Sequence, residues 1–94
     1  MKIRCTLLSI KGIAANKLLA LADVELDFDG VLVEVNSVRL EREQNGTSVR
    51  LPIDRDGRAL IVLPEEVRQA MADVVLAGAL DAGIVVERFV SASQ

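Results

Sequence analysis

Alternating apolar and polar positions mark the first half of the chain. Across residues 17–27 every even position is apolar, and positions 23, 25 and 27 carry acidic side chains. A repeat of two is typical of a β-strand with one buried face and one face in water. The apolar stretch 3–10, which Gly12 ends, and the stretch 31–43, which follows the turn residues Asp29-Gly30, are predicted as two further strands.

The strand predicted over residues 31–43 changes phase in its middle. Val31, Val33 and Val35 occupy odd positions, whereas Val38 and Leu40 occupy even positions. Because a strand can change phase only by inserting an extra residue, we predict a β-bulge near residues 36–37.

Asn45-Gly46 predicts a hairpin, because both residues of a type I′ turn need positive φ angles. If these two residues form the loop, the register places Glu41 opposite Arg50 as an ion pair and Leu40 opposite Leu51. Apolar pairs then share one face of the hairpin and charged pairs the other.

The second half of the chain changes to a helical pattern. After a turn at residues 54–57, the apolar stretch 59–63 is predicted as a short strand. Pro64 suits a helix start and Gly83 a helix end. The β-branched stretch 84–90 is predicted as a final strand or extended arm, with frayed residues after it. The apolar stripe predicted for the helix consists of Val67, Met71, Val74, Val75 and Gly78.

Together these elements predict an α+β fold, an antiparallel β-meander with one C-terminal helix. The 94 residues have room for one domain, 1–94. Apolar residues make up 51% of the chain, which is high for a domain of this size. We therefore expect a second copy to cover part of the apolar surface, so that the protein is a homodimer.

The residue types exclude several kinds of chemistry. Histidine is absent and Cys5 is the single cysteine, so an internal disulfide, a Cys/His zinc site and a nucleophile–histidine pair are all excluded. Cys5 is expected to be a buried thiol. The acidic positions 23, 25, 27 and 29 match an EF-hand loop only loosely, because its twelfth position would be Asn36. We expect a non-enzymatic protein without cofactor or metal.

Membrane and export signals are not recognised either. No apolar stretch approaches the roughly 20 residues that span a bilayer, and residues 1–11 are too short for a secretory leader. We therefore expect a cytoplasmic protein that does not bind membranes.

The basic residues are concentrated in one part of the chain. Eleven basic and fourteen acidic residues give a net charge of −3. Arginine suits phosphate groups because its planar guanidinium binds them through two parallel hydrogen bonds. Acidic residues are interleaved with the arginines between residues 39 and 68, so on composition an ion-paired, solvated surface explains them better than nucleic-acid binding does. Six of the eight arginines lie between residues 39 and 68: Arg39, Arg42, Arg50, Arg55, Arg58 and Arg68.

The order of several short motifs resembles the stage V sporulation protein G (SpoVG) family over about residues 1–80. The segment 45–52, NGTSVRLP, is similar to the family signature N-G-x-x-V-x-[ML]-P. The other similar segments are ALADVELD at 20–27, VRL at 38–40, DG at 56–57, LP at 63–64 and the helix segment 68–76.

This resemblance implies an α+β domain that forms a homodimer by strand exchange. It also implies a bacterial cytoplasmic regulator, linked to sporulation and septation, that binds DNA or RNA. At four positions where the family has basic residues implicated in this binding, this chain has arginine. The resemblance therefore implies four candidate nucleic-acid-binding residues: Arg39, Arg50, Arg58 and Arg68.

The chain departs from the family where positive charge is expected. Ala70 replaces a lysine, Leu63 replaces a histidine, and Ile53-Asp54 stands where the family has a Lys-Arg pair. The alternative hypothesis is therefore a protein–protein interaction module on the same scaffold, without nucleic-acid binding, that uses a sheet edge or the segment 84–90.

Overall fold

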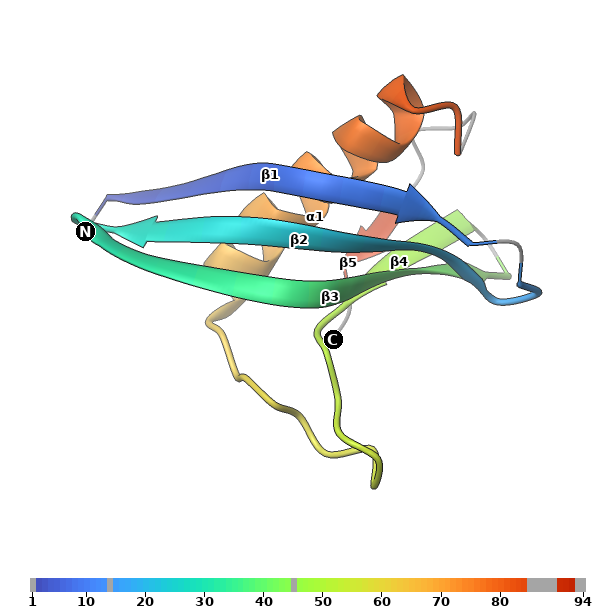
Figure 1. Cartoon of the computed structure of the whole chain (residues 1–94), viewed down its shortest axis with the longest axis horizontal. Coiled ribbons are helices and arrows are strands. Elements are labelled where there is room, and N and C mark those ends of the chain that lie inside the picture. Colours follow the sequence, from blue (N-terminus) through green and yellow to red (C-terminus); the bar gives the residue numbers. More distant parts are fainter. Residues whose placement is uncertain (1, 14, 45, 85–89, 93–94) are drawn as a thin grey trace.

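The computed structural model describes residues 2–13, 15–44, 46–84 and 90–92. Four antiparallel strands form a meander, a helix follows, and a short fifth strand joins the sheet parallel to the fourth (Figure 1). This arrangement confirms the predicted α+β fold with one helix. The elements are β1 (Ile3–Gly12), β2 (Leu18–Phe28), β3 (Val31–Glu43), β4 (Gly46–Arg50), α1 (Glu65–Asp81) and β5 (Val90–Ala92).

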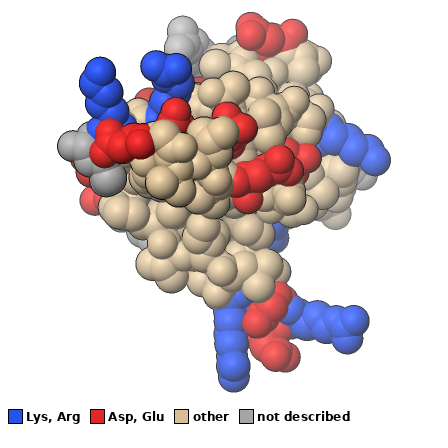
Figure 2. Space-filling view, turned by 60° about the vertical axis from the view of Figure 1, so that its left-hand side comes forward, with Lys and Arg blue, Asp and Glu red and all other residues tan. Residues whose placement is uncertain are grey.

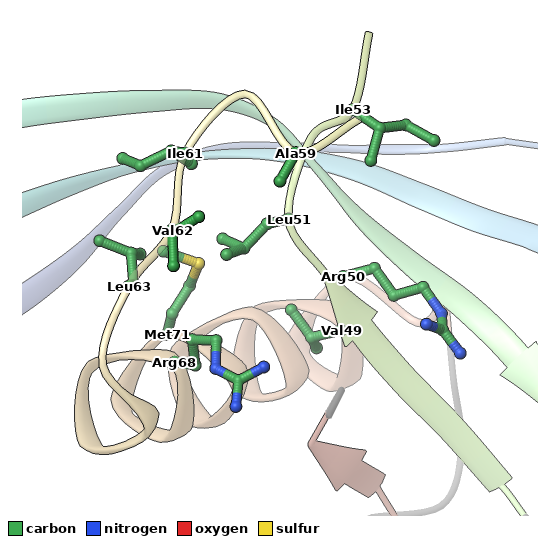
Figure 3. Close-up of a pocket in the computed structure, with 10 residues that line it drawn as sticks. All are labelled: Val49, Arg50, Leu51, Ile53, Ala59, Ile61, Val62, Leu63, Arg68 and Met71. Carbon is green, nitrogen blue, oxygen red and sulfur yellow. The ribbon is translucent and has the colours of Figure 1, made fainter. Parts of the chain in front are cut away.

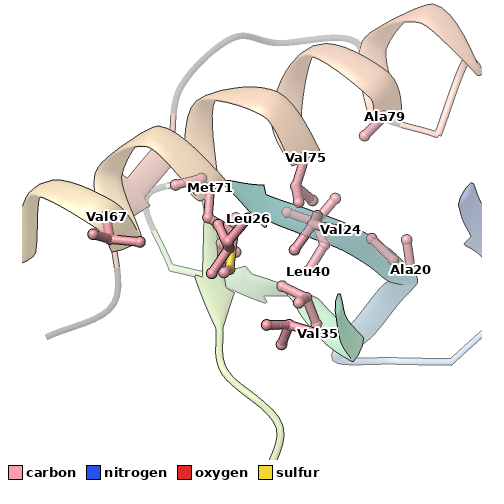
Figure 4. Close-up of a cluster of buried hydrophobic side chains, with 13 residues drawn as sticks. Ala20, Val24, Leu26, Val35, Leu40, Val67, Met71, Val75 and Ala79 are labelled. Atoms are coloured by element: carbon pink, nitrogen blue, oxygen red, sulfur yellow. The ribbon is translucent and has the colours of Figure 1, made fainter. Parts of the chain in front are cut away.

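The hydrophobic core lies between α1 and one face of the sheet (Figure 4). The even positions of β2 are buried there, as their alternation predicts. Leu26 is fully buried, and burial of a side chain of its size stabilises the fold by roughly 1.5–3 kcal/mol. The core consists of Ala20, Ala22, Val24, Leu26, Val35, Val38, Leu40, Val49, Val67, Met71, Ala72, Val75 and Ala79.

The predicted bulge is confirmed, and Asp23 stabilises it. Asn36 and Ser37 of β3 both lie opposite Asp23, and Ser37 has a φ of 63°. The Ser37 amide donates to Asp23 Oδ1 at 3.0 Å. The Ser9 hydroxyl of β1 donates to Oδ2 at 2.9 Å, next to a second register shift around Leu8. One carboxylate therefore holds the irregular positions of both neighbouring strands.

The register predicted for the β3–β4 hairpin is wrong by two residues. Leu40 pairs with Val49 instead of Leu51, and Glu43 with Gly46 is the last pair before the turn. Residue 45 itself lies outside the described residues. A shift of two leaves every side chain on its predicted face, so the apolar pattern is equally compatible with both registers.

The predicted strand at residues 59–63 is also wrong. A single bridge joins Ala59 to Ile53, and no ladder follows it. A strand that continued the meander would pair with the edge of β4 that β3 leaves open, and β5 occupies that edge. The chain between β4 and α1 instead forms a long projecting segment, residues 51–63, which we call the arm (Figure 1).

The helix has the predicted bounds. Pro64 immediately precedes its first residue, and Gly83, with a φ of 74°, follows its end. Gly78 is a contact position, since a Cβ there would overlap the Leu7 side chain of β1. The predicted stripe is partly wrong, because Val74 and Gly78 are only half-buried. The buried helix residues are Val67, Met71, Ala72, Val75, Leu76 and Ala79.

The last strand lies later in the chain than predicted. It comprises Val90–Ala92, so residues 91 and 92, which were expected to fray, are in the sheet. Residues 85–89 and 93–94 lie outside the described residues. The extended segment predicted over 84–90 and the fraying predicted for the last residues fall partly on them.

Candidate functional site

Two of the four candidate arginines meet on the sheet face opposite the helix. Arg39 of β3 lies directly opposite Arg50 of β4. Two like charges at facing positions repel each other, so this pair requires a counter-charge. Glu41, two positions along β3 on the same face, supplies it.

Glu41 is the centre of this charged cluster. Its side chain is only 2% exposed, and it forms ion pairs with Arg39, with Arg50 Nε at 3.2 Å and with Lys17 Nζ at 3.7 Å. A buried carboxylate is stable only when cations or hydrogen-bond donors compensate its lost hydration. The expected pairing of Glu41 with Arg50 is therefore present, although it runs diagonally across the strands.

Glu43 adds a second carboxylate to Arg50. Ser48 Oγ donates to Glu43 Oε1 at 2.7 Å, and Arg50 Nη2 lies 3.1 Å from the same oxygen. The Ser48 hydrogen bond, followed by that of Arg50, lowers the pKa of Glu43 below its usual value. Arg50 is thus held by two carboxylates, which reduces the net positive charge of this surface.

Arg68 of α1 joins Arg50 at a groove of about 440 Å³ between β4, the arm and the helix. Eight of the ten lining residues are apolar and the other two are these arginines, so no carboxylate is among the described residues that line it. In Figure 3 both arginine side chains extend away from the apolar group that includes Leu51 and Met71, and Val49 lies between them.

Arg58, the fourth candidate, lies on the arm and does not line the groove. The tip of the arm is a turn in which Asp54 Oδ1 accepts hydrogen bonds from the Asp56 and Arg58 amides, both at 2.9 Å. Gly57, with a φ of 80°, completes this turn. Acidic and basic side chains alternate here, and Figure 2 shows both signs of charge on the projecting part. The tip is therefore not a purely positive surface.

The arm also exposes apolar side chains. Val62 is 84% exposed, Leu60 64% and Ile53 45%. Large apolar side chains that are exposed together often mark a surface that binds another apolar surface. The sequence reasoning missed the groove and assigned these residues to a strand. The signal was an apolar stretch bounded by Gly57 and Pro64, with no polar residues in alternation.

The acidic positions of β2 have structural roles in the fold. Asp23 stabilises the bulges, Asp27 accepts from the Gly30 amide at 2.7 Å, and Asp29 accepts from the Lys2 amide at 2.9 Å. In the described part of the chain no group of three or more metal-ligating side chains could hold an ion. Cys5 is half-buried, less than expected, and burial raises its pKa.

Comparisons with known proteins add no relative: no family model, no curated protein and no solved structure matches this chain. The resemblance to the SpoVG family therefore remains a prediction. No helix among the described residues is long and apolar enough to cross a membrane.

Proposed function

We propose that this chain is a non-enzymatic protein-interaction domain whose binding surface consists of the arm and the groove. The observation that supports this proposal is the exposure of Leu60 and Val62 on a projecting segment that also forms one wall of an apolar groove. Exposed apolar side chains beside a concave apolar surface are typical of interaction sites.

A second copy of the chain is the first partner to test, since the composition and the resemblance both predict a homodimer. Sedimentation velocity from about 5 to 200 µM should reveal a concentration-dependent dimer. The double variant Leu60→Ser/Val62→Ser should remain monomeric. A matched control is Val31→Ser/Leu32→Ser, because these residues are similarly exposed, at 63% and 60%, on the β2–β3 hairpin.

Two results would contradict self-association through the arm. Wild type that stays monomeric throughout the concentration range is one of them. A dimer that survives in the arm variant but dissociates in the hairpin control is the other, and it would move the interface to the β2–β3 hairpin.

We keep nucleic-acid binding as a second proposal, because Arg39 and Arg50 lie side by side on the sheet face opposite α1, and Arg50 also lines a groove together with Arg68. The carboxylates of Glu41 and Glu43 weaken its electrostatic support. The test is fluorescence anisotropy with labelled random DNA and RNA at about 50 and 200 mM salt, since phosphate contacts weaken steeply with salt.

The variant for this test is Arg50→Ala/Arg68→Ala, and the control is Arg4→Ala/Lys11→Ala on the far edge strand β1. Binding that falls with salt and with the first variant only would support the proposal. Absence of binding to either polymer at the lower salt concentration would refute it.

A further inference from the structure

The strand β1 forms a long open edge of the sheet. Among the described strands it pairs only with β2 (Figure 1), and no backbone hydrogen bond joins residues 3–12 to any other described element. The amides and carbonyls of a strand alternate between its two sides, so about half of those in β1 point away from the sheet. Residues 3–7 are the regular part of this edge, because the register shift around Leu8 follows them. The other edge strand, β5, has three residues.

The two faces of β1 differ in chemistry. On the side of the helix, Ile3, Cys5 and Leu7 pack against the core but are only half-buried. On the opposite side, Arg4 and Thr6 are exposed. Side chains of paired strands contact their neighbours on the same face. An added strand that suits this edge therefore has apolar residues at every second position, on the side of the helix.

Positive charge marks the exposed side of this edge. The first twelve residues carry Lys2, Arg4 and Lys11 and no carboxylate, in a chain whose net charge is −3. None of these three cations forms an ion pair with a described residue. Asp27, which lies opposite Arg4 in β2, accepts a backbone hydrogen bond from the β2–β3 turn at 2.7 Å instead. The edge therefore favours carboxylates on the exposed face of an added strand.

The same charges disfavour a second β1 strand as the partner. Two β1 strands side by side would bring like charges together without a carboxylate between them, and this arrangement protects edges from self-association. The neighbour that β1 already has shows the chemistry that suits it. In β2 the buried even positions are apolar, and the odd positions on the other face include Asp23, Glu25 and Asp27.

We infer that the open edge of β1 binds an extended segment of a partner protein in which apolar residues alternate with carboxylates. The segment pairs with the backbone of residues 3–7, as in recognition by strand addition. Its apolar side chains lie beside Ile3 and Leu7, and its carboxylates approach Lys2 and Arg4. This surface is separate from the arm and the groove, which lie at the β4 end of the sheet, so the inference goes beyond the proposed function.

The probe is a capped, fluorescein-labelled peptide with the sequence of residues 20–27, ALADVELD, because this segment already pairs with the inner side of β1. It is titrated with the full-length chain, with anisotropy for its affinity and ¹⁵N NMR for its location. Binding should be saturable, with amide shifts centred on residues 3–7. The control peptide ALAKVKLK has lysine in place of the three carboxylates and should bind at least about tenfold more weakly, because attraction becomes repulsion.

Two variants test the charge and a modified peptide tests the strand pairing. Lys2→Gln/Arg4→Gln should weaken binding about fivefold, because two exposed ion pairs are lost. Lys11→Gln, on the same strand but beyond the register shift, is the matched control and should change the affinity less than about twofold. N-methylation of one alternate set of peptide amides should abolish binding and of the other set should not, because only one set points toward β1.

Each contrary result overturns the inference at a different point. Absence of saturable binding up to millimolar protein would show that the edge takes no such strand. Amide shifts at residues 61–63 instead of 3–7 would place the peptide in the groove and support the proposed function alone. Equal affinities of the two peptides, or equal effects of the two variants, would show that charge does not select the partner. Shifts at residues 3–7 that grow with protein concentration in the absence of peptide would assign the edge to a second copy.

Discussion

Replacing Glu41 by glutamine should destabilise the fold although it changes almost no volume. The substitution removes the negative charge from a side chain that is 2% exposed and surrounded by Lys17, Arg39 and Arg50. It also directs an amide, which has its own N–H donors, toward guanidinium donors. Arg39 and Arg50 would then face each other with only Glu43, which contacts Arg50, as a counter-charge.

The size of the effect follows from the exposure of the cations. Breaking a fully buried ion pair costs about 3–5 kcal/mol. Here the side chains of Arg39, Arg50 and Lys17 are 31%, 42% and 66% exposed, so water can solvate them once Glu41 is gone. We therefore expect a loss of about 2 kcal/mol in the free energy of unfolding.

Urea unfolding followed by circular dichroism measures this loss, because the chain has no Trp or Tyr for fluorescence. With a denaturant slope of about 1.5 kcal/mol/M, the midpoint should fall by about 1.3 M. Glu43→Gln is the control: its side chain is 33% exposed, so its loss should lower the urea midpoint clearly less than the loss of Glu41 does.

A double variant tests whether charge is the cause. Glu41→Gln/Arg39→Gln should be less destabilised than the sum of its single variants, because removing Arg39 relieves the repulsion. A Glu41→Gln protein within about 0.5 kcal/mol of wild type would refute the reasoning, since it would show that the cluster is solvated and contributes little.

Three further predictions concern the sheet. Asp23→Ala should cost about 1–2 kcal/mol, because it removes the hydrogen bonds from Ser9 and Ser37; Glu25→Ala on the same face should cost less in the same urea assay, and an equal cost would contradict the role of Asp23 at the bulges. Ser37→Gly should raise stability by about 0.5–1 kcal/mol in thermal or urea unfolding, because its φ of 63° strains a residue with a Cβ; a loss would show that the serine side chain matters more than the strain. The pKa of Glu43 is lowered from its usual value near 4.5, so the contribution of its carboxylate to stability is present above that value and is lost as pH falls through the folded-state pKa. Urea midpoints measured across this acidic range should therefore fall less steeply with pH in Glu43→Gln than in wild type. The same dependence on pH in both proteins would contradict the prediction.

Most of the fold could be predicted because local rules act on neighbouring residues. The even positions of β2 are buried because a strand alternates its faces. The phase change between Val35 and Val38 required the bulge that is present at Asn36 and Ser37. Pro64 and Gly83 bound the helix through their own backbone preferences.

The candidate site could be predicted only in part, because it depends on which segments meet. The sequence indicated that Arg39 and Arg50 share a face, and they do. It did not indicate that Glu41 would be buried between them, because the register that places them opposite each other differs by two residues from the one predicted. Nor could it show that Arg68 and Arg50 line the same groove, since they lie on different elements joined by the arm.

The sequence by itself therefore determined the strands β1 to β3, the bulge, the helix and the α+β class, because each depends on periodicity or on the φ preference of nearby residues. Tertiary structure decided the hairpin register, the parallel addition of β5 and the fate of residues 59–63. In each of these cases alternatives satisfy the local pattern equally well. Competition for hydrogen-bonding edges and compensation of buried charge, both of which are long-range, select one of them.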